Sequence, residues 1–180
     1  MRLTKANLDA RFYSLLFVVG VLSFVVHEFA HWIMGTSLGY EMLASPNHVW
    51  SKTPTSPTHE MLISAAGPTI TIVQGIVGFW LVRSQASLLG FAMLYMAFFS
   101  RLLAAAVSVL NPNDEARISA QLGLGTWTLP IIVVAALFAL TYLASRHLKL
   151  SLRQQFLCYV IASVAVTLVV GVDHFFVSKA

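Results

Sequence analysis

The stretch FYSLLFVVGVLSFVVHEFAHWIMG, from Phe12 to Gly35, decides the fold of this chain. It is longer than the roughly 20 mostly apolar residues that an α-helix needs to cross a bilayer. Near its end stand His27, Glu28 and His31. Ionisable residues inside a membrane span are costly and are usually functional. The stretch therefore predicts a transmembrane helix that carries a polar site.

Four further apolar stretches of similar length follow. They are Met61–Val82, Leu88–Leu110, Trp127–Ala144 and Phe156–Phe176. The 180 residues are 58% hydrophobic and 10% charged, whereas a soluble domain is about 45–50% apolar and about 25% charged. This composition excludes a disordered chain and argues against a water-soluble enzyme. We predict an all-α, polytopic membrane helical bundle with about five transmembrane helices, in which residues 1–180 form one integral membrane domain.

The basic residues indicate an orientation in the membrane. They are scattered between apolar runs, so the net charge of +4 does not indicate a nucleic-acid partner. Cytoplasmic connections of membrane proteins are enriched in Lys and Arg. Seven basic residues fall on the side of the N-terminus and three on the other side: Arg2, Lys5, Arg11, Arg83, Arg146, Lys149 and Arg153 against Lys52, Arg117 and Lys179. This bias predicts that the N-terminus is cytoplasmic and the C-terminus is outside.

Two connections are longer than tight turns, and both fall on the side opposite the N-terminus. The segment Thr36–Glu60 contains three prolines and predicts a long loop, with a short hairpin around Tyr40–Trp50. The segment Asn111–Gly125 predicts a turn followed by a short helix, with Asn113 as the N-cap and Gly123 at the end.

The residues His27, Glu28 and His31 form an H-E-x-x-H motif. Side chains four residues apart share one helix face, so both imidazoles can bind one metal ion. Zinc accepts such ligands and leaves a position for water in catalytic sites. Glu28 would take a proton from that water and deliver it to the leaving amine. A hydrogen-bonded core cluster, or an inactive relic of a metal site, is the alternative that the motif leaves open.

Two short motifs follow the H-E-x-x-H in order along the chain. They are Ala66-Gly67-Pro68, at the start of the second span, and Asn111-Pro112-Asn113-Asp114, at the end of the third. With these three motifs the chain resembles the site-2 protease family of intramembrane zinc metalloproteases, as a short member without a PDZ domain. The resemblance covers about Phe17 to Gly125. It implies a three-helix metalloprotease-like core at about residues 12–125 and additional helices at about 127–176.

The resemblance implies the ligands of one zinc ion, Zn²⁺. They are His27, His31 and Asp114, with Glu115 as the other candidate for the third ligand. Without the resemblance, Asp114 is equally well explained as a carboxylate favoured by a helix start. Family members usually face their metal site toward the cytoplasm, which is opposite to the side that the charge bias gives here.

The resemblance also implies residues that bind the substrate: Asn111, Gly67, Pro68 and Thr71. Two of the family's positions differ in this chain. Thr71 stands where the family commonly has an asparagine, and Glu115 stands where a glycine often follows the aspartate. Since Pro68 is expected at the start of the second span, it would disturb that helix little.

Other polar residues are less readily explained. An isolated arginine such as Arg101, near the middle of the third span, is costly in a bilayer. We expect it to pair with Glu28 or Asp173, to face a water-filled cavity, or to bind a partner. Asp173 and His174 are expected at the membrane interface. Three loop residues are expected to be solvated: His48, His59 and Glu60.

The function predicted from the sequence is that of an intramembrane zinc endopeptidase. Its substrate would be a membrane protein or a membrane-proximal peptide, which Thr36–Glu60 would hold by strand addition. One alternative is a non-catalytic, metalloprotease-like subunit that binds or assembles partners in the membrane. Another is a small transporter or channel subunit with Glu28, Arg101 and Asp173 along its path. The expected location is a bacterial or archaeal cell membrane, with no nucleic-acid partner and an oligomeric state that the sequence does not indicate.

Overall fold

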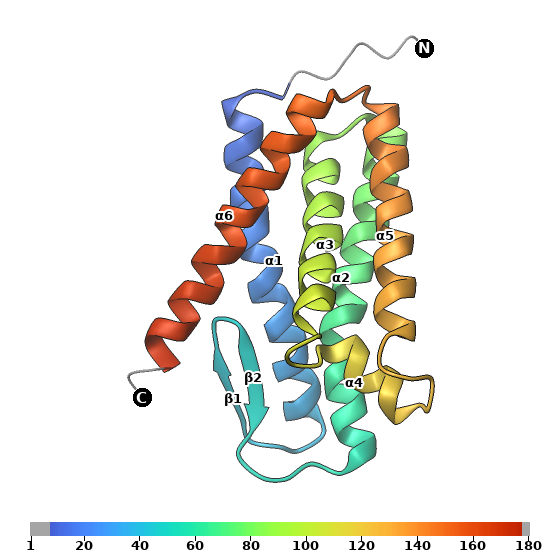
Figure 1. Cartoon of the computed structure of the whole chain (residues 1–180). Coiled ribbons are helices and arrows are strands. Elements are labelled where there is room, and N and C mark those ends of the chain that lie inside the picture. The colour runs from blue at the N-terminus through green and yellow to red at the C-terminus, as the bar shows by residue number, and fades with distance from the viewer. Residues whose placement is uncertain (1–7, 178–180) are drawn as a thin grey trace.

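The structure of this chain is a computed structural model that describes residues 8–177. Within this range it contains six α-helices and one β-hairpin (Figure 1). In chain order they are α1 (Ala10–Ser37), β1 (Met42–Ser45), β2 (His48–Ser51), α2 (Pro57–Gln85), α3 (Leu88–Val107), α4 (Asp114–Gln121), α5 (Thr128–His147) and α6 (Leu152–Val177). Arg2, Lys5 and Lys179, which contribute to the charge bias, lie outside the described residues.

Five of these helices, α1, α2, α3, α5 and α6, are long and apolar enough to cross a membrane. The prediction of a helical bundle compatible with a multi-pass membrane protein is therefore confirmed. Several helix ends differ from the apolar stretches. For example, α2 begins at Pro57 rather than Met61, because the hydroxyl of Ser56 accepts a hydrogen bond from the backbone N–H of His59 and caps a polar first turn.

The prediction that Pro68 starts the second span is wrong. Pro68 lies inside α2, because the polar turn around Thr58 and His59 extends the helix toward the N-terminus. A proline inside a helix has no N–H for the carbonyl four residues earlier, here that of Ser64. The interruption of the backbone hydrogen bonds thus falls beside the two histidines, next to Gly67.

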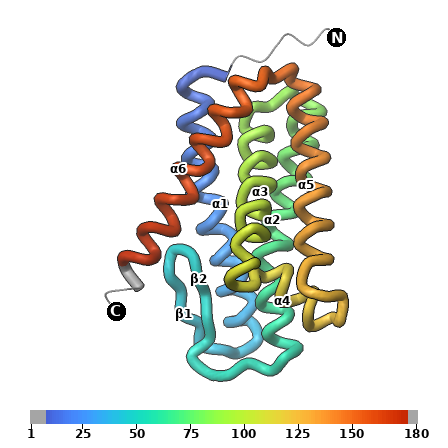
Figure 2. The backbone as a smooth tube through the Cα atoms, viewed as in Figure 1, coloured from blue at the N-terminus to red at the C-terminus, as the bar shows by residue number. Residues whose placement is uncertain are grey.

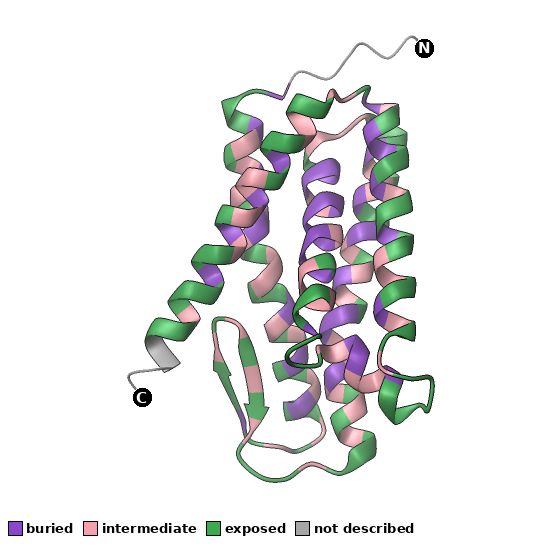
Figure 3. Cartoon of the chain, viewed as in Figure 1, coloured by how far each residue is buried: buried purple, intermediate pink, exposed green. Residues whose placement is uncertain are grey.

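The helix α3 forms the centre of the bundle. It contacts α1, α2, α5 and α6, and most of its first three turns are buried (Figure 3). The outward faces of the other helices carry exposed apolar side chains, such as Val25, Ile76 and Phe138. This distribution fits helices whose outer faces contact lipid.

One end of the bundle is closely packed. The start of α1, the α2–α3 connection and the α5–α6 connection lie together there (Figure 2). We refer to it as the packed end. Its buried side chains include Phe12, Leu16, Val82, Phe91 and Leu94.

The opposite end holds the hairpin, α4 and the C-terminal end of α1, and we refer to it as the site end (Figure 1). Both the hairpin and the short helix were predicted. Strands β1 and β2 are antiparallel, with Ala44 opposite Val49. The side chain of Asn113 caps α4 by accepting a hydrogen bond from the N–H of Ala116 at 2.9 Å. Gly123, with φ +71°, follows its last turn.

Candidate metal centre

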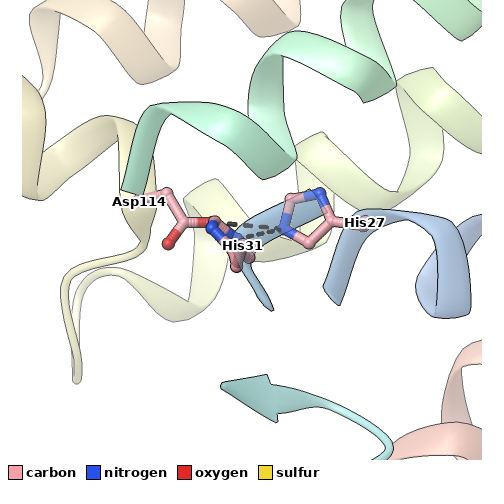
Figure 4. A group of neighbouring side chains, drawn as sticks. All are labelled: His27, His31 and Asp114. Carbon is pink, nitrogen blue, oxygen red and sulfur yellow. Dashed lines mark hydrogen bonds and ion pairs between the residues drawn. The ribbon is translucent and has the colours of Figure 1, made fainter. Parts of the chain in front are cut away.

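The two histidines of the H-E-x-x-H motif point from α1 toward the first turn of α4 (Figure 4). Each is 6% exposed. The Nε2 atoms of His27 and His31 lie 3.1 Å apart. One carboxylate oxygen of Asp114, Oδ2, lies 3.2 Å from Nε2 of His27 and 3.4 Å from Nε2 of His31. The structure thus brings together three side chains that can hold a metal ion, from segments far apart in the sequence.

The partner of each Nδ1 atom fixes the orientation of the imidazoles. Nδ1 of His31 lies 2.6 Å from the carbonyl oxygen of Ile63, which can only accept a hydrogen bond. Nδ1 of His27 lies 3.0 Å from the hydroxyl of Thr71, which itself donates to the carbonyl of Gly67. Both Nδ1 atoms are therefore donors. A neutral imidazole then carries its lone pair on Nε2, which faces the triad.

Three acceptor atoms consequently face one another without a proton between them. Burial alone raises the pKa of the Asp114 carboxyl, but a proton taken up by either imidazole would donate to this carboxylate, and this holds its pKa well below the usual range. Such a cluster of lone pairs is stabilised by a cation at its centre. The triad is therefore suited to bind a metal ion.

Gly67 permits this close arrangement. A Cβ atom built at Gly67 would lie 2.6 Å from Nε2 of His27 and would also collide with Nε2 of His31. Only a residue without a side chain lets the α2 backbone approach both imidazoles so closely. The motif Ala66-Gly67-Pro68 thus packs directly behind the triad.

The second oxygen of Asp114 is held by Arg117. Nη2 of Arg117 donates to Oδ1 of Asp114 at 2.6 Å and lies 3.4 Å from the hydroxyl of Ser64 on α2. This contact turns Oδ2 toward the histidines. This role of Arg117 is not among the predictions from the sequence. Its spacing of three residues from Asp114 on an expected helix is the signal that indicates it.

The triad opens into a cavity of about 970 Å³, lined by α1, the hairpin, α2, α3, α4 and α6. Glu28 is half-buried, lines this cavity and makes no hydrogen bond with another described residue. His48, expected to be solvated, is exposed on β2 but also lines the cavity. Partial burial of its ring and the positive charge of Arg117 lower its pKa. At neutral pH the imidazole of His48 is therefore uncharged.

The four residues predicted to bind substrate lie in two places. Asn111 lines the cavity. Gly67, Pro68 and Thr71 are buried in α2 and are not among the lining residues, since they pack behind the imidazoles. Direct contact of these four residues with a substrate stays a prediction.

The expected pairing of Arg101 with Glu28 or Asp173 is wrong, whereas Arg101 does line a cavity, as one of the alternatives predicted. Its Nη1 atom lies 3.3 Å from Oε1 of Glu115, because α4 packs against α2 and α5 with its first turn within reach of the long Arg101 side chain. Glu115 therefore faces Arg101 and is not part of the triad. Asp173 instead accepts a hydrogen bond from the backbone N–H of Asn47, at the turn of the hairpin.

The site thus combines two imidazoles and a carboxylate that can bind an ion with a further carboxylate, Glu28, in the same cavity. Such a combination can activate water beside a metal ion and transfer its proton. Comparisons of the chain with models of protein families, with curated proteins and with solved structures found no match.

Proposed function

We propose that this chain is an intramembrane zinc endopeptidase of the site-2 protease type. The spacing of the triad carries the proposal. Zinc ligands lie about 2.0–2.1 Å from the ion, so two ligands of a tetrahedral site lie about 3.3 Å from each other. The three ligand-atom distances of the triad are 3.1, 3.2 and 3.4 Å.

The donor set supports zinc over the other common divalent ions. Magnesium and calcium prefer sites made of oxygen atoms, whereas His27 and His31 offer nitrogen. Two histidines and one carboxylate also hold iron(II) in oxygenases. Glu28 favours hydrolysis, because it places a base in the cavity that the triad opens into.

Glu28 acts as the general base in this proposal. When bound, the zinc ion supplies Lewis acidity to the scissile carbonyl and to the attacking water. The carboxylate of Glu28 takes the proton of that water and then delivers it to the leaving amine. Its half-buried position in the cavity lets the carboxylate face both water and substrate. Asp114, His27 and His31 would hold the ion.

Helices α1, α2 and α3 would form the metalloprotease-like core, together with α4. The motif residues come from α1 and α4, and the carbonyl of Ile63 and the hydroxyl of Thr71, which orient the histidines, come from α2. The helix α3 supports α4 through Arg101 and Glu115. Helices α5 and α6 then surround this core as additional helices.

The substrate would be a membrane protein or peptide whose helix unwinds near the site end. Backbone amides of a helix are already hydrogen-bonded, so an attacked segment has to become extended. The strand β2 (His48–Ser51) lines the cavity and pairs with β1 along one edge. Its other edge is suited to pair with an extended substrate segment by strand addition.

Cleavage by wild type and by Glu28→Gln tests the proposal. Both proteins are reconstituted in vesicles with a panel of tagged single-span peptides that contain helix-weakening residues near one membrane surface. We expect wild type to cleave at least one peptide and Glu28→Gln to be slower by about 10²- to 10⁴-fold, the usual contribution of a general base. Zinc content should be the same in both. Equal cleavage by the two proteins would contradict the mechanism.

Glu60→Gln is the matched control, because Glu60 is an exposed carboxylate that lines the same cavity. It should cleave like wild type. Zinc binding without cleavage of any peptide would favour the non-catalytic subunit. Ion flux through the vesicles that depends on Glu28 and Arg101 would favour a transporter.

A further inference from the structure

The proposed mechanism does not use the arginine in α3. Arg101 is 6% exposed, and its guanidinium reaches the first turn of α4. There Nη1 lies 3.3 and 3.4 Å from the two carboxylate oxygens of Glu115, and 3.8 Å from Oδ2 of Asp114. One buried cation therefore faces two neighbouring carboxylates, of which only Asp114 belongs to the metal centre.

The buried carboxylate of Glu115 depends on Arg101 for its charge compensation. It is 3% exposed, and its only other hydrogen-bond donor among the described residues is Nδ2 of Asn113, at 2.8 Å. A buried carboxylate that loses its opposite charge is strongly unfavourable. Without Arg101, Glu115 would turn toward water, and the adjacent Asp114 would move with it.

The other arginine near the site cannot replace this anchor. Arg117 belongs to α4 itself, so its bond to Asp114 orients the carboxylate within that helix. Its side chain is 40% exposed, and its contact to Ser64 on α2 is 3.4 Å long. Among the described residues, the buried ionic links between α4 and a membrane-spanning helix are therefore made by Arg101, with its shorter contact to Glu115 and its longer contact to Asp114.

We propose that Arg101 is a positioning residue for the metal centre: by holding Glu115, it fixes the first turn of α4 so that Asp114 faces the two histidines. This inference rests on the proposed metal centre. It also explains how two consecutive carboxylates have different roles, since Glu115, which lies closer to Arg101 and meets it with both oxygens, is held away from the ion. Oδ2 of Asp114 remains directed toward Nε2 of both histidines.

The test compares wild type with Arg101→Gln, which removes the charge, and Arg101→Lys, which keeps it. Arg83→Gln is the matched control, because Arg83 is an exposed arginine at the packed end that contacts His147. Two quantities are measured in detergent or nanodiscs. One is zinc affinity, by competition with a chelator. The other is amide hydrogen exchange of α4, in protein stripped of metal.

We expect Arg101→Gln to bind zinc about 10- to 100-fold more weakly, as for other residues that orient metal ligands. We also expect faster exchange in α4, while α2 and α5 keep the exchange rates of wild type. Arg101→Lys should restore most of the protection of α4. Arg83→Gln should change neither quantity.

Unchanged exchange of α4 in Arg101→Gln would overturn the proposal, whether or not zinc binds. Faster exchange in α2, α4 and α5 alike, with no restoration by Arg101→Lys, would assign Arg101 to general stability and would also overturn it. Wild type that binds no zinc would contradict the proposed metal centre instead. In that case the exchange of α4 still decides whether Arg101 positions Asp114.

Discussion

The packed end and the site end of the bundle are stabilised by different kinds of contact. At the packed end, apolar side chains fill the space between helices, as where Phe91 packs between Phe12 and Tyr95 at ring distances of 6.2 and 5.8 Å. At the site end, buried polar groups meet in hydrogen bonds and ion pairs. The triad, Thr71 and Arg101 are examples.

This difference separates stability from chemistry. Apolar packing stabilises the association of the helices. Because it has little directional preference, it does not determine which polar atoms face one another. Hydrogen bonds and ion pairs prefer narrow ranges of distance and angle, so they determine which atoms face one another. A substitution at the packed end should therefore lower the stability of the fold and leave metal binding intact. A substitution at the site end should weaken metal binding and leave the fold intact.

The largest effect on stability is expected from Phe91→Ala at the packed end. Phe91 is fully buried, and removing such a ring usually lowers the free energy of unfolding by about 3–5 kcal/mol. Denaturation in micelles measures this loss. Zinc bound per folded molecule should stay as in wild type. Phe138→Ala is the control, because the ring of Phe138 is 57% exposed. It should lower the free energy of unfolding by much less. Loss of zinc from folded Phe91→Ala protein would show that the two ends are not independent.

The largest effect at the site end is expected from Gly67→Ala. The added Cβ would meet both imidazoles, so the histidines can no longer converge. Substitution of a residue that only orients a metal ligand weakens metal affinity by about 10- to 100-fold. Because Gly67→Ala displaces two ligands directly, we expect zinc affinity to fall by more than about 100-fold. Chelator competition measures this change.

Gly171→Ala is the control for this substitution, because a Cβ at Gly171 meets nothing within 4 Å. Alanine is the better helix former, so Gly171→Ala should keep the zinc affinity and stabilise α6 slightly. Zinc affinity that is unchanged in Gly67→Ala would refute the close approach of α2 to the triad.

A smaller effect is expected from Thr71→Val. This change keeps the shape of the side chain but removes the oxygen that accepts from Nδ1 of His27. We expect zinc affinity to fall toward the lower end of the 10- to 100-fold range. Thr141→Val is the control, since the buried hydroxyl of Thr141 has no hydrogen-bond partner among the described residues. If both variants bind zinc equally well, Thr71 does not orient His27.

The sequence predicts the features that depend on local pattern. Five apolar stretches give the five helices that are long and apolar enough to cross a membrane, and the four-residue spacing of His27 and His31 puts both imidazoles on one face of α1. The N-cap preference of Asn113 and the glycine at 123 give the limits of α4. These predictions succeed because each depends on neighbours within a few turns of the same helix.

The sequence does not predict contacts between distant segments. Arg101 pairs with Glu115 rather than Glu28 or Asp173, because the packing of α4 against α2 and α5 brings its first turn within reach of the Arg101 side chain. Pro68 lies inside α2, because a polar capped turn precedes the apolar stretch. Asp114 is found only through the order of the three motifs. Its convergence with the histidines depends on how α1, α2 and α4 pack.

Zinc content tests the central claim most directly. Wild type, His31→Ala, Asp114→Ala and the control His59→Ala are purified in parallel, exposed to zinc and freed of loosely bound metal. His59 is a suitable control, because its Nδ1 atom forms a hydrogen bond with the hydroxyl of Tyr40 at 2.9 Å and it lies outside the triad. We predict about one zinc ion per chain in wild type and His59→Ala, and almost none in His31→Ala and Asp114→Ala. Equal zinc content in all four proteins, or no zinc in wild type, would contradict the proposed metal centre.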